Sequence, residues 1–136
     1  MTPQEELVGQ LATHLQLPSL ALDADHACAL AFPDGLQVDL RFLPPRPVFR
    51  FCATLGVPIA ERKEEFMAGL LLTNLVFGEQ GEPCFAMNQA SGAVLLCRNL
   101  SYAQLAVQVV ADDIARLVNA AREFRQLFAH QQMLAM

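Results

Sequence analysis

Residues 64–77, EEFMAGLLLTNLVF, form the stretch that decides the fold. At about 100° per residue, the apolar side chains of this stretch fall all round a helix, and only Gly69, Thr73 and Asn74 interrupt them. A helix without a polar face is buried on every side. A chain of 136 residues can cover one side of such a helix with its own core and has little left for the other. The pattern therefore predicts a second subunit, and a protein that works by contact.

Composition and charge narrow the class of protein. Hydrophobic residues make up 54% of the chain and charged residues 17%, which is too apolar for disorder and enough for a sizeable core. The length suits one domain, spanning residues 1–136. With 9 basic and 14 acidic residues the net charge is -5, which argues against nucleic acid or a membrane as partner. A secretory signal and a membrane span are not expected either.

Alternating apolar residues predict five strands. The strand-like segments are residues 26–32, 36–42, 48–54, 83–88 and 93–100. Asp34 and Gly35 separate the first two as a hairpin turn. Together with three helices, these strands give the order α-β-β-β-α-β-β-α. The predicted fold class is α+β, with a twisted, mainly antiparallel five-stranded sheet.

Two of the helices have clear signals at their ends. The first helix begins with a capping box, in which Thr2 caps and Glu5 completes the box. The second helix covers residues 60–77, and we expect Gly78 and Gly81 to end it.

The third helix is long and amphipathic. Ser101 and Gln104 predict a capping box at its start. Asp112 and Asp113 could be paired carboxylates, but we expect them on the solvated side of the helix. Asp112 stands four residues before Arg116, so these two predict an ion pair.

Signals of catalysis are poor. The sequence has no glycine-rich phosphate loop, no nucleophile elbow and no metal-binding motif. Without metal-type spacing, the cysteines are expected to be reduced and buried in a cytoplasmic protein: Cys28, Cys52, Cys84 and Cys97. A Cys97 thiolate stabilised by Arg98 is the alternative. The histidines are expected on solvated faces: His14, His26 and His130.

Apolar residues also point to both faces of the predicted sheet. Residues 93–97, AVLLC, and the set Ala27, Ala29 and Ala31 are the clearest cases. One face must pack on helices. The other face, if uncovered, would be a shallow apolar surface beside an edge strand, which suits an extended polypeptide. Alternatively, the long last helix covers that face.

These segments, in this order, resemble the class I chaperones of type III secretion, the Tir-chaperone-like family. The similar segments are residues 28–35 (CALAFPDG), 49–56 (FRFCATLG), 70–78 (LLLTNLVFG) and 94–100 (VLLCRNL), with a short helix before them and a long one after. One departure is residues 82–87, EPCFAM, where relatives tend to have a glycine-rich lead into the strand. Pro83 would weaken strand pairing there.

The resemblance implies a bacterial cytoplasmic homodimer without catalytic residues, metal or cofactors. It implies binding to the N-terminal chaperone-binding region of a type III secreted effector, which is kept soluble and ready for export. The implied dimer contacts lie on the central helix: Phe66, Leu70, Leu71, Asn74 and Leu75. The implied effector contacts lie on the first helix and the sheet: Leu7, Leu11, Leu15, Phe42 and Leu95.

Two alternatives stay open at this point. The same fold could serve a regulatory or adaptor protein that binds a folded partner of the secretion machinery. A small thiol-dependent enzyme using Cys97 is the third hypothesis.

Overall fold

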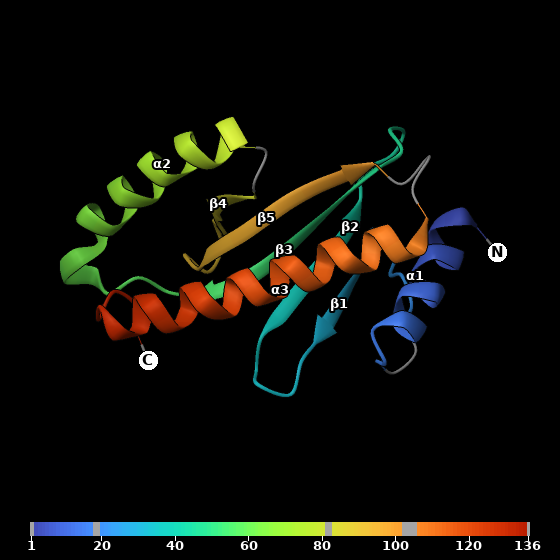
Figure 1. Cartoon of the computed structure of the whole chain (residues 1–136), viewed down its shortest axis with the longest axis horizontal. Coiled ribbons are helices and arrows are strands. Elements are labelled where there is room, and N and C mark those ends of the chain that lie inside the picture. The colour runs from blue at the N-terminus through green and yellow to red at the C-terminus, as the bar shows by residue number, and fades with distance from the viewer. Residues whose placement is uncertain (1, 18–19, 81–82, 102–105, 136) are drawn as a thin grey trace.

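The computed structural model describes residues 2–17, 20–80, 83–101 and 106–135 (Figure 1). The helices are α1 (Pro3–His14), α2 (Lys63–Gln80) and α3 (Val107–His130), and a short 3-10 turn, η1 (Ala60–Arg62), leads into α2. The strands are β1 (Ala27–Ala31), β2 (Gln37–Phe42), β3 (Val48–Gly56), β4 (Cys84–Met87) and β5 (Val94–Ser101). The α+β class and the predicted order of elements are confirmed.

The strands form one antiparallel sheet in the order β1-β2-β3-β5-β4. Alternate residues of β2 are buried, as the period of two predicts: Val38, Leu40 and Phe42. The turn before β2 is the predicted hairpin turn, because Gly35 has a φ of 85° and the Asp34 carboxylate accepts a hydrogen bond from the Leu36 N–H at 3.3 Å. The sheet therefore has one face of buried apolar side chains and a second face of exposed side chains.

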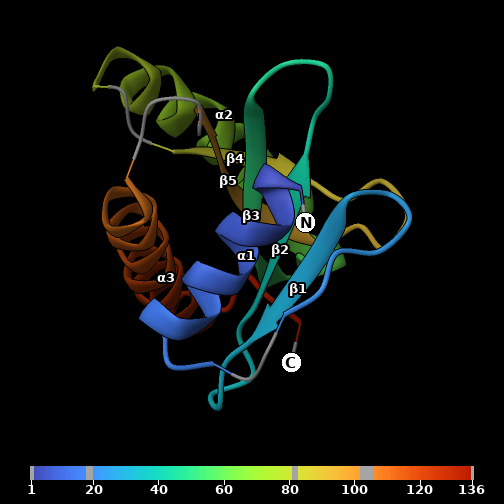
Figure 2. The ribbon, with the colours of Figure 1, turned by 90° about the vertical axis from the view of Figure 1, so that its right-hand side faces the viewer.

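The long helix α3 crosses the apolar face of the sheet (Figure 1). Its buried side chains meet those of β3 and β5 in one core, and they include Val110, Ile114, Leu117 and Ala121. Helix α1 packs against α3, and Figure 2 shows α1 and α3 on the same side of the sheet. The predicted capping box of α1 is confirmed, since Glu5 N–H donates to Thr2 Oγ1 and Thr2 N–H donates to Glu5 Oε2, both at 3.1 Å.

Helix α2 attaches to one end of this core through aromatic rings. The Phe66 ring meets the Phe128 ring of α3 edge to face, with centroids 4.8 Å apart. The Phe77 ring stacks on the Phe85 ring of β4 at 6.0 Å. Helix α2 is therefore held along a narrow line beside the edge strand β4, and the rest of its surface faces away from the protomer.

The helix end predicted at Gly78 and the helix start predicted at Ser101 are wrong. Helix α2 runs through Gly78 to Gln80, because a glycine on an exposed helix position costs only about 1 kcal/mol; Gly81 lies outside the described residues. Ser101 does not cap α3. It is the last residue of β5 and pairs with Val48, so the sheet extends over the predicted cap. Helix α3 instead begins after Ala106, which makes no side-chain capping bond; Gln104 lies outside the described residues.

Within the described residues, no helix combines the length and the apolar character that crossing a membrane requires.

Candidate functional site

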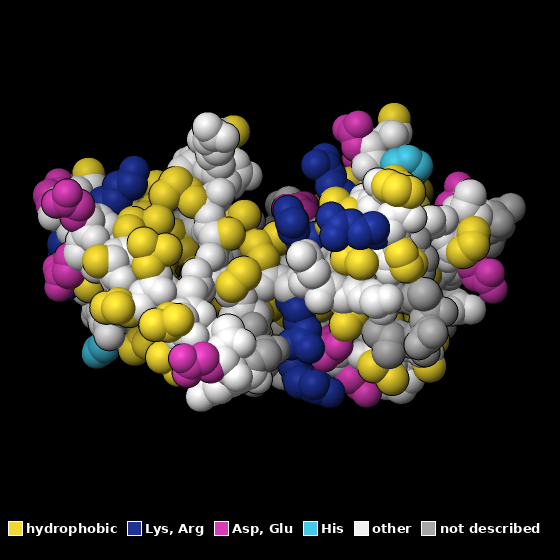
Figure 3. Space-filling model, turned by 90° about the horizontal axis from the view of Figure 1, so that it is seen from above, with side chains coloured by type: hydrophobic (Ala, Val, Ile, Leu, Met, Phe, Trp, Pro, Cys, Tyr) yellow, Lys and Arg dark blue, Asp and Glu magenta, His cyan; other side chains and the backbone are white. Residues whose placement is uncertain are grey.

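The outer face of α2 is an exposed apolar surface. Leu71, Leu72 and Leu75 are 69%, 70% and 66% exposed, and Val76 is 49% exposed. We call these four residues the α2 stripe. Figure 3 shows hydrophobic side chains gathered over this part of the molecule, at the left of the view. Exposed leucines in contiguous rows are unusual on a protein without partners, so the stripe is a candidate contact surface.

The structure separates the predicted dimer residues into two groups. Phe66 and Leu70 lie in the core of the protomer, 5% and 6% exposed. Asn74 is half-buried and bonds to the backbone of Phe85. Only Leu71 and Leu75 project outward. Sequence reasoning missed Leu72 and Val76, because a helix that is apolar all round does not reveal which side faces its own core.

A hollow of about 440 Å³ opens between α2 and α3. Its walls carry four aromatic rings: Phe66, Phe85, Phe124 and Phe128. Gly69 also lines it, and no atom outside the helix backbone lies within 4 Å of where a Gly69 Cβ would stand. The hollow therefore adds an aromatic groove to the apolar surface of α2.

The predicted effector contacts do not form one patch. Leu11 is 0% exposed and Phe42 is 3% exposed, so both belong to the core. Leu7 of α1 and Leu15, the residue directly after α1, are half-buried and pack beside that core. Leu95 is half-buried too, but its neighbours Val94 and Leu96 point into the core, so Leu95 faces the other side of the sheet.

The side of the sheet away from α3 is open in the protomer. We call it the open sheet face. It is more polar than predicted, because its exposed side chains include Asp39, Arg41, Arg50 and Asn99, and Arg50 Nε donates to Asn99 Oδ1 at 3.1 Å. Three alanines add small residues near its edge: Ala27, Ala29 and Ala31. The last helix covers only the opposite, apolar face.

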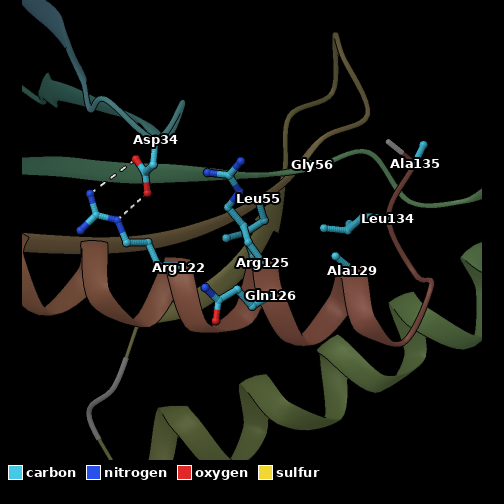
Figure 4. A pocket seen from close by; sticks show the side chains of 9 residues that line it. All are labelled: Asp34, Leu55, Gly56, Arg122, Arg125, Gln126, Ala129, Leu134 and Ala135. Atoms are coloured by element: carbon cyan, nitrogen blue, oxygen red, sulfur yellow. Dashed lines mark hydrogen bonds and ion pairs between the residues drawn. The ribbon is translucent and has the colours of Figure 1, made fainter.

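A further hollow, of about 540 Å³, lies between the β1–β2 turn and the end of α3 (Figure 4). Arg122 Nε donates to Asp34 Oδ2 at 2.7 Å, and the guanidinium stands 5.4 Å from the centre of the Phe32 ring. The hydrogen bond from Arg122 is the main reason that the pKa of Asp34 is lowered. The nine lining residues include no cysteine, serine, threonine or histidine. The Asp34 carboxylate among them is held by Arg122, and this ion pair ties the hairpin to α3.

The predicted ion pair between Asp112 and Arg116 is wrong. Asp113, 7% exposed, is the paired carboxylate, with Arg116 at 3.2 Å and Arg98 at 3.9 Å. Asp112 is exposed and accepts a hydrogen bond from Gln108. Asp113, which was expected on the solvated side, lies among the buried residues of α3, whereas Asp112 lies on the exposed side.

The surroundings of the cysteines and histidines support neither a Cys97 thiolate nor a metal site within the described residues. The three histidines are exposed, as predicted. Of the four cysteines predicted to be buried, only Cys97 is buried; Cys28 and Cys52 are half-buried, and Cys84 is exposed. The pKa of Cys97 is raised by its hydrogen bond to Cys52 and by burial, and the Arg98 side chain reaches Asp113 instead. These contacts oppose a Cys97 thiolate. Among the described residues, no group of His, Cys, Asp and Glu is arranged to hold a metal ion.

Solved structures share this fold over nearly the whole chain. A chain in the ExsC–ExsE complex has a TM-score of 0.80 and 24% identity, covering 97% of this chain and 95% of its own length. A chain in the HopA1–SchA chaperone–effector complex has a TM-score of 0.73 and 16% identity, covering 89% and 91%. A chain in the complex of SycH, a type III secretion chaperone of Yersinia pestis, with a fragment of YscM2 has a TM-score of 0.67 and 18% identity, covering 88% and 98%.

A comparison with curated protein sequences finds no match. The model of the Tir chaperone protein (CesT) family, by contrast, matches residues 6–125. This match spans most of the sequence and agrees with the fold, so the chain belongs to the CesT family of Tir chaperones, a family of chaperones and not of enzymes.

Proposed function

We propose that this protein is a dimeric chaperone of the bacterial cytoplasm that binds the N-terminal region of a type III secreted effector. It keeps that region soluble and ready for export. The observation that carries the proposal is the large apolar surface of a protomer in this chaperone family, above all the α2 stripe. No cofactor enters the mechanism, because masking apolar segments requires only complementary surface.

The α2 stripe is proposed to meet a second copy of the chain. Burial of apolar surface contributes roughly 25 cal/mol per Å² before the costs of association are subtracted. Leu71, Leu72 and Leu75 each offer most of a leucine side chain to such burial. Phe66, Leu70 and Asn74 then act indirectly, because they hold α2 against its own protomer in the orientation that presents the stripe.

The effector is proposed to contact Leu7 of α1, Leu15 directly after α1, and Leu95 on the open sheet face. These are the predicted contacts that keep accessible surface. Leu11 and Phe42 support these surfaces from the core. Because the contacts lie on two sides of the protomer, an effector segment that reaches all of them is extended and wraps round the chaperone. Its affinity comes from several small apolar contacts.

Recovery of the native complex tests this proposal. The tagged chain is expressed at its natural level in its native host, and co-purifying proteins are identified by mass spectrometry. We expect one secreted protein whose capture is lost when its N-terminal region is deleted. Leu7→Glu should reduce that capture, and the matched change Val109→Glu, at an exposed valine early in α3, should not. Capture of a folded cytoplasmic regulator instead would favour the adaptor hypothesis.

A further inference from the structure

Three cysteines form a row across the open sheet face. Cys52 of β3 lies opposite Cys97 of β5, and Cys97 lies opposite Cys84 of β4. They come from segments far apart in the sequence and are brought together only by strand register. A hollow of about 350 Å³ on this face is lined by all three, so solutes reach the row from solvent.

The two neighbouring pairs in the row differ in backbone geometry. Leu43 N–H donates to Val48 O, so the backbone N–H and C=O of Val48 point to β2. In an antiparallel sheet this direction alternates from residue to residue, so the N–H and C=O of Cys52, four residues further on, also point to β2. Asn88 N–H donates to Ala93 O, so the backbone N–H and C=O of Ala93 point to β4. By the same alternation, the N–H and C=O of Cys97, four residues further on, also point to β4. Cys52 and Cys97 therefore share no backbone hydrogen bond, whereas Cys84 and Cys97 form a hydrogen-bonded pair.

This difference favours one pair for a covalent link. At a non-hydrogen-bonded position the Cα atoms are about 4.5 Å apart and the side chains are closer than at the wider position of about 5.5 Å. Both Cα separations lie within the range that disulfides span, so the closer approach of the side chains is what favours Cys52 and Cys97. Cys52 and Cys97 stand directly opposite each other in the register of β3 and β5, and both line the same hollow.

The surroundings give the two thiols different roles. The hydrogen bond from Cys97 lowers the pKa of Cys52, and the nearby Arg50 guanidinium lowers it further, against burial and the Asp39 carboxylate on the other side. The pKa of Cys97 is raised by the same hydrogen bond and by burial. Cys52 is thus the better nucleophile, and Cys97 is the protonated neighbour placed to complete a disulfide.

We propose that Cys52 and Cys97 form a redox-reactive dithiol site on the open sheet face, whose substrate is a low-molecular-weight disulfide. The Cys52 thiol loses its proton to solvent and its sulfur attacks one sulfur of that disulfide; the S–S bond breaks, and the first small thiolate leaves and takes up a proton. The Cys97 sulfur then attacks the Cys52 sulfur, and the Cys97 proton passes to the second small thiolate as that group is expelled. Two protein thiols are oxidised, and one small disulfide is reduced to two thiols.

Oxidised glutathione is the probe for this site. The folded, full-length protein is incubated with it, remaining thiols are alkylated, and peptides are mapped by mass spectrometry without reduction. We expect a Cys52–Cys97 disulfide, with Cys28 and Cys84 not joined to either. A disulfide between Cys84 and Cys97, or stable glutathione adducts without any Cys52–Cys97 link, would overturn the proposal.

Serine variants assign the two roles. In Cys97→Ser the second step is absent, so a glutathione adduct should accumulate on Cys52. Cys52→Ser should form no disulfide within the row, and Cys84→Ser should react as the parent protein does. Circular dichroism checks that each variant is folded. An unchanged Cys52 in folded Cys97→Ser, or loss of the disulfide in folded Cys84→Ser, would contradict the assignment.

Discussion

Asn74 of α2 hydrogen-bonds the main chain of Phe85 in the edge strand β4 in both directions. Its Nδ2 donates to Phe85 O at 2.9 Å, and Phe85 N–H donates to its Oδ1 at 2.6 Å. Asn88 N–H donates to Ala93 O, so the backbone of Asn88 points to β5. This direction alternates along β4, so the N–H and C=O of Phe85, three residues earlier, point away from β5. The side-chain amide thus takes the place of a further strand. It fastens α2 to the sheet and closes this edge to strand addition at Phe85.

Replacing Asn74 with alanine should destabilise the protein. The change leaves a half-buried N–H and C=O of Phe85 without their partner, which costs about 1–3 kcal/mol of unfolding free energy. Urea denaturation measures the change. Asn119→Ala removes an exposed asparagine of α3 and should change stability by less than about 0.5 kcal/mol. Equal losses in the two variants would show that the Asn74 bonds contribute nothing.

Leu11 and Leu7 of α1 should respond differently to substitution. Leu11 is 0% exposed in the core, so Leu11→Ala should cost about 2–5 kcal/mol and Leu11→Glu should abolish cooperative unfolding. Leu7 is half-buried at the flank of the helix, so Leu7→Glu should remain folded. Urea denaturation of the three variants measures this. A Leu11→Glu protein as stable as the parent would place Leu11 on a surface and restore it as an effector contact.

Short-range patterns predicted the elements well. The alternation of Val38, Leu40 and Phe42 depends only on the strand period, and the Thr2–Glu5 capping box only on four consecutive residues. Both signals are local, and at these positions no pairing with a distant segment overrides them.

Features that depend on distant segments were not predictable in this way. Ser101 satisfies a local capping pattern, but pairing with Val48 extends the strand through it. Helix α2 is apolar all round, so its sequence does not show which side faces the core. The buried Phe66 and the exposed Leu71 could be distinguished only from the contact of Phe66 with an aromatic ring of α3. The meeting of Cys52 with Cys97 likewise rests on register between separate strands.

Cys28 should resist alkylation until the pH is high. Burial raises the pKa of Cys28 to about 11, and the Asp23 and Asp39 carboxylates add to the effect. The thiolate is the reactive form, so the rate with iodoacetamide should stay low near pH 9 and climb as the pH approaches 11. The folded state holds the proton more tightly, so this group's contribution to stability is present below pH 9 and is lost as the pH rises toward 11.

The Asp23 charge can be tested separately. Asp23→Asn keeps the oxygen that accepts from the Asp25 and Ala27 N–H groups and removes the negative charge. It should therefore shift the alkylation profile of Cys28 to lower pH. Peptide mapping after timed alkylation gives the rate at Cys28 alone. An unchanged profile would assign the raised pKa to burial and Asp39 without Asp23.

Leu71→Asp should convert the proposed dimer to a folded monomer. Leu71 is 69% exposed in the protomer, so a charge there does not disturb the core. In a dimer through the α2 stripe the same charge would be buried without a partner, and we expect the dissociation constant to rise at least about 100-fold, or about 2.8 kcal/mol. Light scattering gives the mass and circular dichroism the fold. Val109→Asp, at a valine 43% exposed on α3, should stay dimeric. A folded Leu71→Asp protein that also stays dimeric would place the interface elsewhere.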